Sequence, residues 1–224
     1  MVVLAAHPDD EVLGVGGLLV RLADRGCDLL VVTATEGEAS HPGSPTVSPA
    51  ELATRRRNEQ DAALVDLGHA AAERMHLHLP DSRLVERERE LGDRLQVVLG
   101  DADLLLAPWA GDGHPDHEAA GRAARRGVAE LAAVTAAVGG SDHARALWEY
   151  PVWAWHWARP DADALPWQRA RVVALELHQQ QAKRDAVGRF ASQLHPLSDH
   201  PADAAVLPPA VREHFDRAYE IVLT

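Results

Sequence analysis

Short apolar runs alternate with longer segments of helical period along this chain. Residues 2–6 form a run of Val, Leu and Ala that is long enough for a buried strand. Residues 12–25 follow with the apolar spacing of a helix, and Gly26 is typical of a residue that ends one. Because strands and helices continue to alternate, we predict an α/β fold with a mainly parallel sheet flanked by helices.

The remaining elements follow from the same rules. Residues 35–49 are rich in Gly, Pro and Ser and predict a long loop. Ser48 and Pro49 suit the start of the next helix, and Gly68 suits its end. The other predicted strands cover residues 29–33, 74–79, 103–107, 147–157 and 171–177, and the other predicted helices cover residues 50–67, 84–99, 117–138, 179–193 and 210–223.

Composition limits the classes of partner. With 224 residues, of which 46% are hydrophobic, the chain can bury one full core, and we predict a single domain over residues 1–224. A net charge of −12 argues against nucleic acid or an anionic membrane as a partner. No apolar run approaches the ~20 residues of a membrane span, and no basic segment precedes the first apolar run. We therefore expect a cytoplasmic protein without a signal peptide; the sequence leaves homo-oligomer formation open.

Cysteine usage restricts the choice of metal ligands. Cys27 is the only cysteine, which excludes an intramolecular disulfide and a cysteine-based zinc site. Any metal ion must therefore be bound by His and carboxylate side chains.

The first cluster of titratable side chains directly follows the first predicted strand. It contains His7, Asp9, Asp10 and Glu11. Open α/β sheets place their ligands at the carboxyl ends of strands. Carboxylates this close repel one another in a dry pocket, and a bound cation is the simplest way to keep them ionised. The alternative is a polar turn in which Asp9 or Asp10 caps the following helix.

A second cluster, His114-Pro115-Asp116-His117, follows the strand predicted at residues 103–107. Parallel strands end at the same edge of a sheet, so we expect the two clusters to meet. Imidazole and carboxylate ligands suit Zn²⁺, and three protein ligands with an open position are typical of a catalytic zinc site. The alternative is two unrelated His-Pro-Asp turns.

The two clusters together resemble the paired motifs of the PIG-L/LmbE-like family of zinc-dependent N-deacetylases, which act mainly on N-acetylglucosaminyl groups. The resemblance implies a Rossmann-like LmbE fold and extends over most of the chain. Its further matches are Thr35-Glu36-Gly37-Glu38, Arg56-Arg57-Asn58-Glu59, Leu67-Gly68, Lys183 and Ser192-Gln193.

The resemblance also implies a role for each motif residue. His7, Asp10 and His117 become the metal ligands, with one Zn²⁺ or another divalent ion per chain. Asp9 becomes the general base that takes a proton from water, and His114 becomes the oxyanion stabiliser or general acid.

Other polar residues near the motifs are expected to support the chemistry or to contact the substrate. Asp116 is expected to orient a histidine ring. Some family members carry Tyr two positions before the second motif, where this sequence has Asp112, and we expect Asp112 to face the substrate. Among the three consecutive arginines 55–57, we favour Arg56 as the one that faces the site.

Aromatic side chains are concentrated in residues 148–157. On the predicted strand Trp153, Trp155 and Trp157 share one face, because they recur at period two. Trp153 could belong to a wall that stacks on a sugar substrate, or the three rings could form core packing or a subunit contact. His156 falls on the opposite face and is expected to be structural.

These observations predict a zinc-dependent hydrolase that removes an N-acetyl group from an N-acetylglucosamine-containing small molecule or glycoside. Two alternatives stay open: an amidase that acts on another acyl group, and a non-catalytic metal-binding domain. The presence of Asp9 and His114 as polar groups outside the predicted ligand set argues against the second alternative.

Overall fold

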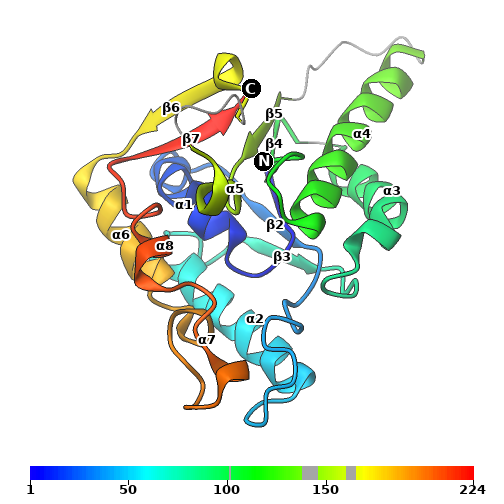
Figure 1. Cartoon of the computed structure of the whole chain (residues 1–224). Helices are drawn as coiled ribbons and strands as arrows, with labels where there is room; N and C mark the ends of the chain where they lie inside the picture. The colour runs from blue at the N-terminus through cyan, green and yellow to red at the C-terminus, as the bar shows by residue number, and fades with distance from the viewer. Residues whose placement is uncertain (101, 138–145, 160–164) are drawn as a thin grey trace.

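The computed structural model describes residues 1–100, 102–137, 146–159 and 165–224. Within these residues the strands form one seven-stranded sheet in the order β3-β2-β1-β4-β5-β7-β6 (Figure 1). The strands are β1 (Val2–Ala5), β2 (Leu30–Thr33), β3 (Glu73–His76), β4 (Leu104–Pro108), β5 (Ala146–Tyr150), β6 (Ala170–Ala174) and β7 (Tyr219–Leu223).

The sheet is parallel from β3 to β5. Val3 in the middle of β1 pairs in register with Val31 of β2 and Leu106 of β4. β3 joins β2 and β5 joins β4 in the same direction. β7 lies between β5 and β6 and runs antiparallel to both. The predicted α/β class with a mainly parallel sheet is therefore confirmed.

Helices cover both faces of the sheet (Figure 1). On one face α1 (Asp10–Ala23), α2 (Pro49–Asp66) and α6 (Leu177–Val187) enclose one hydrophobic core. On the other face α3 (Glu88–Val98) and α4 (Pro115–Ala137) enclose a second core. The short helical segments are α5 (Ala154–Trp157), α7 (Ala191–Leu194), α8 (Pro209–Arg212) and the 3₁₀ turns Leu84–Arg87, Trp167–Arg169 and Pro201–Asp203.

The start of α2 follows its sequence signals. The Ser48 side chain accepts a hydrogen bond from the Glu51 backbone, and the Glu51 carboxylate accepts one from Ser48 N at 2.9 Å. Pro49 occupies the first turn, and Gly68 has a φ of 82° just after the helix. This reciprocal capping box ends the predicted long loop at the predicted position.

The strand predicted at residues 147–157 is wrong in its second half. β5 ends at Tyr150, and Ala154–Trp157 form the helical turn α5. Pro151 has no N–H to donate to a neighbouring strand. The Asp112 carboxylate accepts hydrogen bonds from the next three backbone N–H groups and so holds the start of the turn. The three tryptophans therefore do not share one strand face.

The helix predicted at residues 210–223 is also wrong. α8 ends at Arg212, and Tyr219–Leu223 form β7 inside the sheet. The strand pairs with β6 along its whole length, and Val222 and Leu223 are buried. Pairing with segments distant in sequence outweighed the local helical pattern. The predicted end of the helix at residues 117–138 lies outside the described residues.

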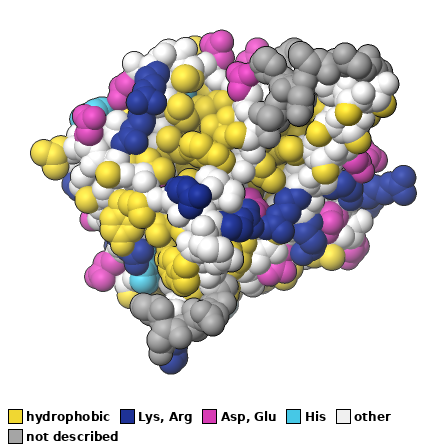
Figure 2. All heavy atoms as spheres, turned by 90° about the horizontal axis from the view of Figure 1, so that it is seen from above, with side chains coloured by type: hydrophobic (Ala, Val, Ile, Leu, Met, Phe, Trp, Pro, Cys, Tyr) yellow, Lys and Arg dark blue, Asp and Glu magenta, His cyan; other side chains and the backbone are white. Residues whose placement is uncertain are grey.

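Apolar side chains gather on the face that is uppermost in Figure 1, between groups of Lys and Arg (Figure 2). Val172 of the edge strand β6 is 67% exposed. Exposed apolar surface is typical of protein contacts, and homo-oligomer formation stays a prediction. No helix in the described part of the chain is long and apolar enough to cross a bilayer.

Candidate active site and metal centre

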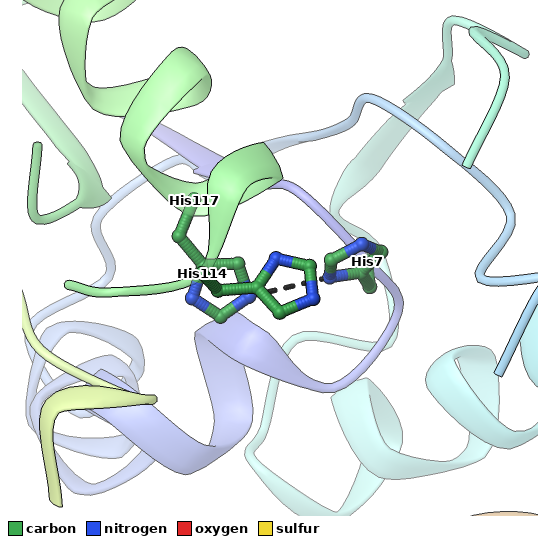
Figure 3. Close-up of side chains that lie close together, drawn as sticks. All are labelled: His7, His114 and His117. Atoms are coloured by element: carbon green, nitrogen blue, oxygen red, sulfur yellow. Dashed lines mark hydrogen bonds between the residues drawn. The ribbon is translucent and has the colours of Figure 1, made fainter. Parts of the chain in front are cut away.

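The two His-Pro-Asp motifs meet at the carboxyl edge of the parallel strands. The first motif links β1 to α1, and the second precedes and begins α4. His7, His114 and His117 gather beneath the start of α4 (Figure 3). They line a cavity of about 220 Å³, together with Asp9 and Asp10. The predicted meeting of the clusters is thus observed.

Three buried side chains direct ligand atoms to one point. His7 Nδ1 lies 3.3 Å from His117 Nε2 and 3.6 Å from an Asp10 oxygen. The other Asp10 oxygen lies 3.2 Å from His117 Nε2. In a tetrahedral zinc site, ligands at ~2.0–2.1 Å from the metal are roughly 3.3 Å apart. The spacing of these three side chains therefore suits a metal ion.

The other ring nitrogen of His7 faces two carboxylates. His7 Nε2 is 3.1 Å from Asp81 Oδ1 and 3.3 Å from Asp116 Oδ2. Asp116 is itself held by the backbone N–H groups of Ser82 and Leu84, at 2.7 and 3.0 Å. Histidine ligands typically donate their second N–H to a carboxylate, which fixes the ring orientation. Asp116 therefore lies where the sequence analysis expected a ring-orienting group.

The other ring nitrogen of His117 faces Asp112. His117 Nδ1 is 2.6 Å from Asp112 Oδ2, and the Asp112 side chain is fully buried. Both Asp112 oxygens also accept backbone N–H groups, from Val152, Trp153 and Ala154. Asp112 was expected to face the substrate, but its two oxygens are bonded within the protein. Asp112 instead orients the His117 ring and holds the start of α5.

The buried carboxylates of the site favour a bound cation. Burial lowers the pKa of His117, but Asp10 and Asp112 outweigh it and raise this pKa to about 9. Burial likewise lowers the pKa of His7, and hydrogen bonds to Asp10, Asp116 and Asp81 raise it well above its usual value. Both imidazoles are therefore doubly protonated and positively charged at neutral pH unless a metal ion is bound. Metal binding displaces such protons, so the residues fit a divalent ion.

Two other groupings of possible ligand atoms overlap this one. The nitrogens of His7, His114 and His117 lie within 4.8 Å of one another, as do ligand atoms of His7, Asp81 and Asp116. We favour the grouping with Asp10, because it leaves Asp81 and Asp116 as the outer partners of His7.

Asp9 lines the cavity in a constrained conformation. Its φ is 132°, in the region that favours glycine, and α1 begins at the next residue. Its side chain makes no capping hydrogen bond, so the expected alternative of an Asp9 cap does not apply. Strained backbone of this kind often occurs at functional sites.

Arg56 holds the Asp9 carboxylate. One guanidinium nitrogen is 2.9 Å from Asp9 Oδ2 and donates to the Pro8 carbonyl at 2.6 Å, and another donates to the Gly37 carbonyl at 3.2 Å. Burial raises the pKa of Asp9 to about 6, although the Arg56 charge opposes this. Arg56 therefore lines the cavity, as predicted, but its guanidinium contacts Asp9 and two backbone carbonyls of the protein.

His114 is the third imidazole of the cavity. The Asp116 N–H donates to His114 Nδ1 at 3.3 Å, so in the neutral ring the hydrogen resides on Nε2. Burial, together with the charges of His117 and His7, lowers the pKa of His114 to about 4. The ring is therefore a neutral hydrogen-bond donor. It meets Trp153 edge to face, with centroids 5.5 Å apart.

The sequence model of the PIG-L family, described as GlcNAc-PI de-N-acetylase, matches residues 2–128. This segment covers more than half of the 224 residues and includes both His-Pro-Asp motifs. The chain belongs to the PIG-L family. The predicted resemblance is thus confirmed.

Relatives in the PIG-L family match part of their own length. A diacetylchitobiose deacetylase from Thermococcus kodakarensis is 32% identical over 120 residues, which cover 51% of this chain and 43% of the relative. A 1D-myo-inositol 2-acetamido-2-deoxy-alpha-D-glucopyranoside deacetylase from Kineococcus radiotolerans is 27% identical over 226 aligned residues, covering 83% of this chain and 54% of the relative. The chain spans about half the length of these curated relatives.

Solved structures share the fold. An A40926 pseudoaglycone deacetylase superposes with a TM-score of 0.65 and 24% sequence identity, over 99% of this chain and 95% of that one. At this identity the likeness establishes a PIG-L-type fold.

Two weaker motifs of the PIG-L resemblance contact each other. Glu59 of α2 accepts hydrogen bonds from the backbone and the hydroxyl group of Ser192, at 2.8 and 2.7 Å. Gln193, the next residue, lines the cavity. Lys183 is further away and donates to the Leu13 carbonyl and the Glu220 carboxylate, at 2.8 and 2.7 Å. These contacts fix α6 and α7 against the helices that carry the site.

Two residues of this PIG-L site were not predicted from the sequence. Asp81 was not singled out, although it follows the third strand at the same edge of the sheet and could have been found by that position. His156 was expected to be structural, but it lines the cavity beside Trp153. The sequence gives no signal that His156 lines the cavity, because its position depends on the helical turn α5, which Asp112 holds in place.

Proposed function

We propose that this chain is a zinc-dependent hydrolase that removes an N-acetyl group from an N-acetylglucosamine-containing small molecule or glycoside. The observation that carries the proposal is that His7 Nδ1, His117 Nε2 and Asp10 converge in one cavity. Asp9 lines the same cavity. The acetyl and amino-sugar specificity comes from the relatives, which are named as deacetylases of such compounds.

His7, Asp10 and His117 hold the metal ion in this proposal, and N/O donors of this kind suit Zn²⁺ among the divalent ions. When bound, the ion supplies Lewis-acid polarisation of the amide carbonyl and lowers the pKa of water. Asp81, Asp112 and Asp116 keep the two imidazoles in the required orientation.

Asp9 acts as the general base. A carboxyl group with a pKa near 6 is well matched to proton transfer at neutral pH. Asp9 takes a proton from water as the water oxygen bonds to the acyl carbon, and Arg56 orients the carboxylate throughout.

His114 stabilises the oxygen that becomes negative when water adds. Its neutral ring donates from Nε2, since Nδ1 accepts the Asp116 N–H. The C–N bond then breaks, the nitrogen receives the proton that Asp9 had taken, and the products are acetate and a free amine.

The test is acetate release from the methyl glycoside of N-acetylglucosamine, with zinc-loaded chain and with chelator-treated chain. We expect release that depends on zinc and is lost in Asp9→Asn, a variant of nearly the same shape. Hydrolysis of longer acyl amides only would favour the general amidase. Stoichiometric zinc binding without hydrolysis of any amide would favour a non-catalytic metal-binding domain and overturn the proposal.

A further inference from the structure

A histidine outside the proposed catalytic set lines the same cavity. The His156 imidazole stacks on the Trp153 indole, with 4.0 Å between ring centroids and 19° between the planes. Trp153 also meets His114 edge to face, with 5.5 Å between centroids. Trp153 therefore contacts both the proposed oxyanion donor and His156.

One ring nitrogen of His156 has no hydrogen-bond partner in the described part of the chain. This atom, Nε2, is buried. Buried polar atoms are nearly always bonded, so an unpaired one suggests a ligand or water that completes it. Burial lowers the pKa of His156, and the nearby Asp112 carboxylate only partly opposes this. The ring is therefore neutral at pH 7 and offers one donor and one acceptor.

The cavity favours a small, uncharged group. Its volume of about 220 Å³ is below the roughly 300–1,000 Å³ of pockets that enclose drug-sized ligands. Arg56 is the only Arg or Lys among the described residues that line it. The guanidinium of Arg56 already contacts Asp9 and two backbone carbonyls. A phosphate or carboxylate group would therefore find no free side-chain cation there, whereas hydroxyl groups suit the neutral donors and acceptors.

The cavity has both apolar and uncharged polar walls. Leu13, Val152 and Leu207 supply apolar surface, and Ser40, Ser82 and Gln193 supply neutral polar groups. Such a combination suits the apolar faces and polar edges of a hydroxylated ring.

We propose that His156 is a specificity-determining residue that hydrogen-bonds a hydroxyl group of an uncharged, ring-sized N-acetylated substrate, while Trp153 packs against the ring. The inference rests on the proposed function, because that function places the reacting amide beside Asp9 and His114.

Binding of two probes tests the inference. One probe is the methyl glycoside of N-acetylglucosamine, and the other is N-acetylcyclohexylamine, which has a six-membered ring without hydroxyl groups. Calorimetry is done on zinc-loaded chain that carries Asp9→Asn to prevent turnover, alone and combined with H156F, H156Q or H178F. Phe retains the stacking without hydrogen bonds, and Gln retains hydrogen bonds. His178 is an exposed histidine that pairs with Asp24, and it provides the matched control.

We expect H156F to weaken glycoside binding about five- to tenfold, the usual net effect of one hydrogen bond, and to leave binding of the cyclohexyl amide unchanged. H156Q should restore glycoside binding to within about threefold, and H178F should have no effect. Zinc content should stay the same in all four proteins.

Equal losses for both probes, no loss in H156F, or no glycoside binding by the Asp9→Asn chain would each overturn the role of His156. Acetate release by the unmodified chain is measured separately. Glycoside binding with no acetate release would overturn the deacetylase proposal and leave the role of His156 intact.

Discussion

The two His-Pro-Asp turns begin with the same three residues but use them in opposite ways. In the first turn His7 directs Nδ1 toward the candidate metal centre, and Asp9 lines the cavity. In the second turn Asp116 is fully buried behind His7, and His114 lines the cavity instead.

The start of the following helix explains the difference. α1 begins after Asp9, which adopts a φ of 132°, whereas α4 begins at Pro115 and includes Asp116 in its first turn. A shared tripeptide therefore does not fix which side chain reaches the centre. The position of each residue relative to the helix start decides it.

The largest effect is expected from a change at the end of the first turn. Asp10→Ala removes the carboxylate that lies between His7 and His117. The zinc content should fall from about one ion per chain to nearly none after dialysis, because one of three protein ligands is lost. Excess zinc should restore activity only partly. Elemental analysis decides this, with Asp24→Ala as an exposed control; full zinc content in Asp10→Ala would exclude Asp10 as a ligand.

The neighbouring change should fail differently. Asp9→Ala leaves His7, Asp10 and His117 in place, so the chain should keep its zinc while kcat falls by about 10²–10⁴, the usual contribution of a general base. Zinc content and kinetics are measured on the same preparation. If Asp9→Ala lost zinc and Asp10→Ala retained it, the two assignments would be reversed.

Changes at the outer carboxylates should separate the supports of the two histidines. Asp112 is the only carboxylate within salt-bridge distance of His117 Nδ1 among the described residues, whereas Asp116 and Asp81 both face His7 Nε2. We expect Asp112→Asn to weaken zinc binding by about 100-fold and Asp116→Asn by about 10-fold. Competition with a zinc chelator measures both. A larger loss in Asp116→Asn would contradict the idea that Asp81 shares its role.

The smallest effect concerns the backbone of the first turn. Asp9→Gly and Asp9→Ala both remove the carboxylate, but only glycine adopts a φ of 132° without steric strain. We therefore expect Asp9→Gly to be more stable than Asp9→Ala by about 1 kcal/mol. Denaturant unfolding of both variants measures the difference, and equal stabilities would show that this turn relaxes when the side chain is removed.

Local sequence patterns were enough to predict the parallel core of the fold and the two clusters of titratable side chains. Alternating strands and helices leave a local pattern, and the capping residues Ser48 and Glu51 act within one turn of helix. Both clusters directly follow strands, and parallel strands end together at one edge of the sheet. Local patterns and one topological rule were therefore sufficient to predict that His7 and His117 lie close together.

Which groups support His7 and His117 depends on contacts between parts of the chain that are distant in sequence. Asp112 is bonded to His117 and to the turn of α5, a choice that depends on how the end of β5 packs beside the second motif. The place of His156 in the cavity follows from that turn, and β7 forms because β5 and β6 offer it partners. These outcomes depend on hydrogen bonds between residues distant in the chain, and such bonds leave no periodic signal in the local sequence.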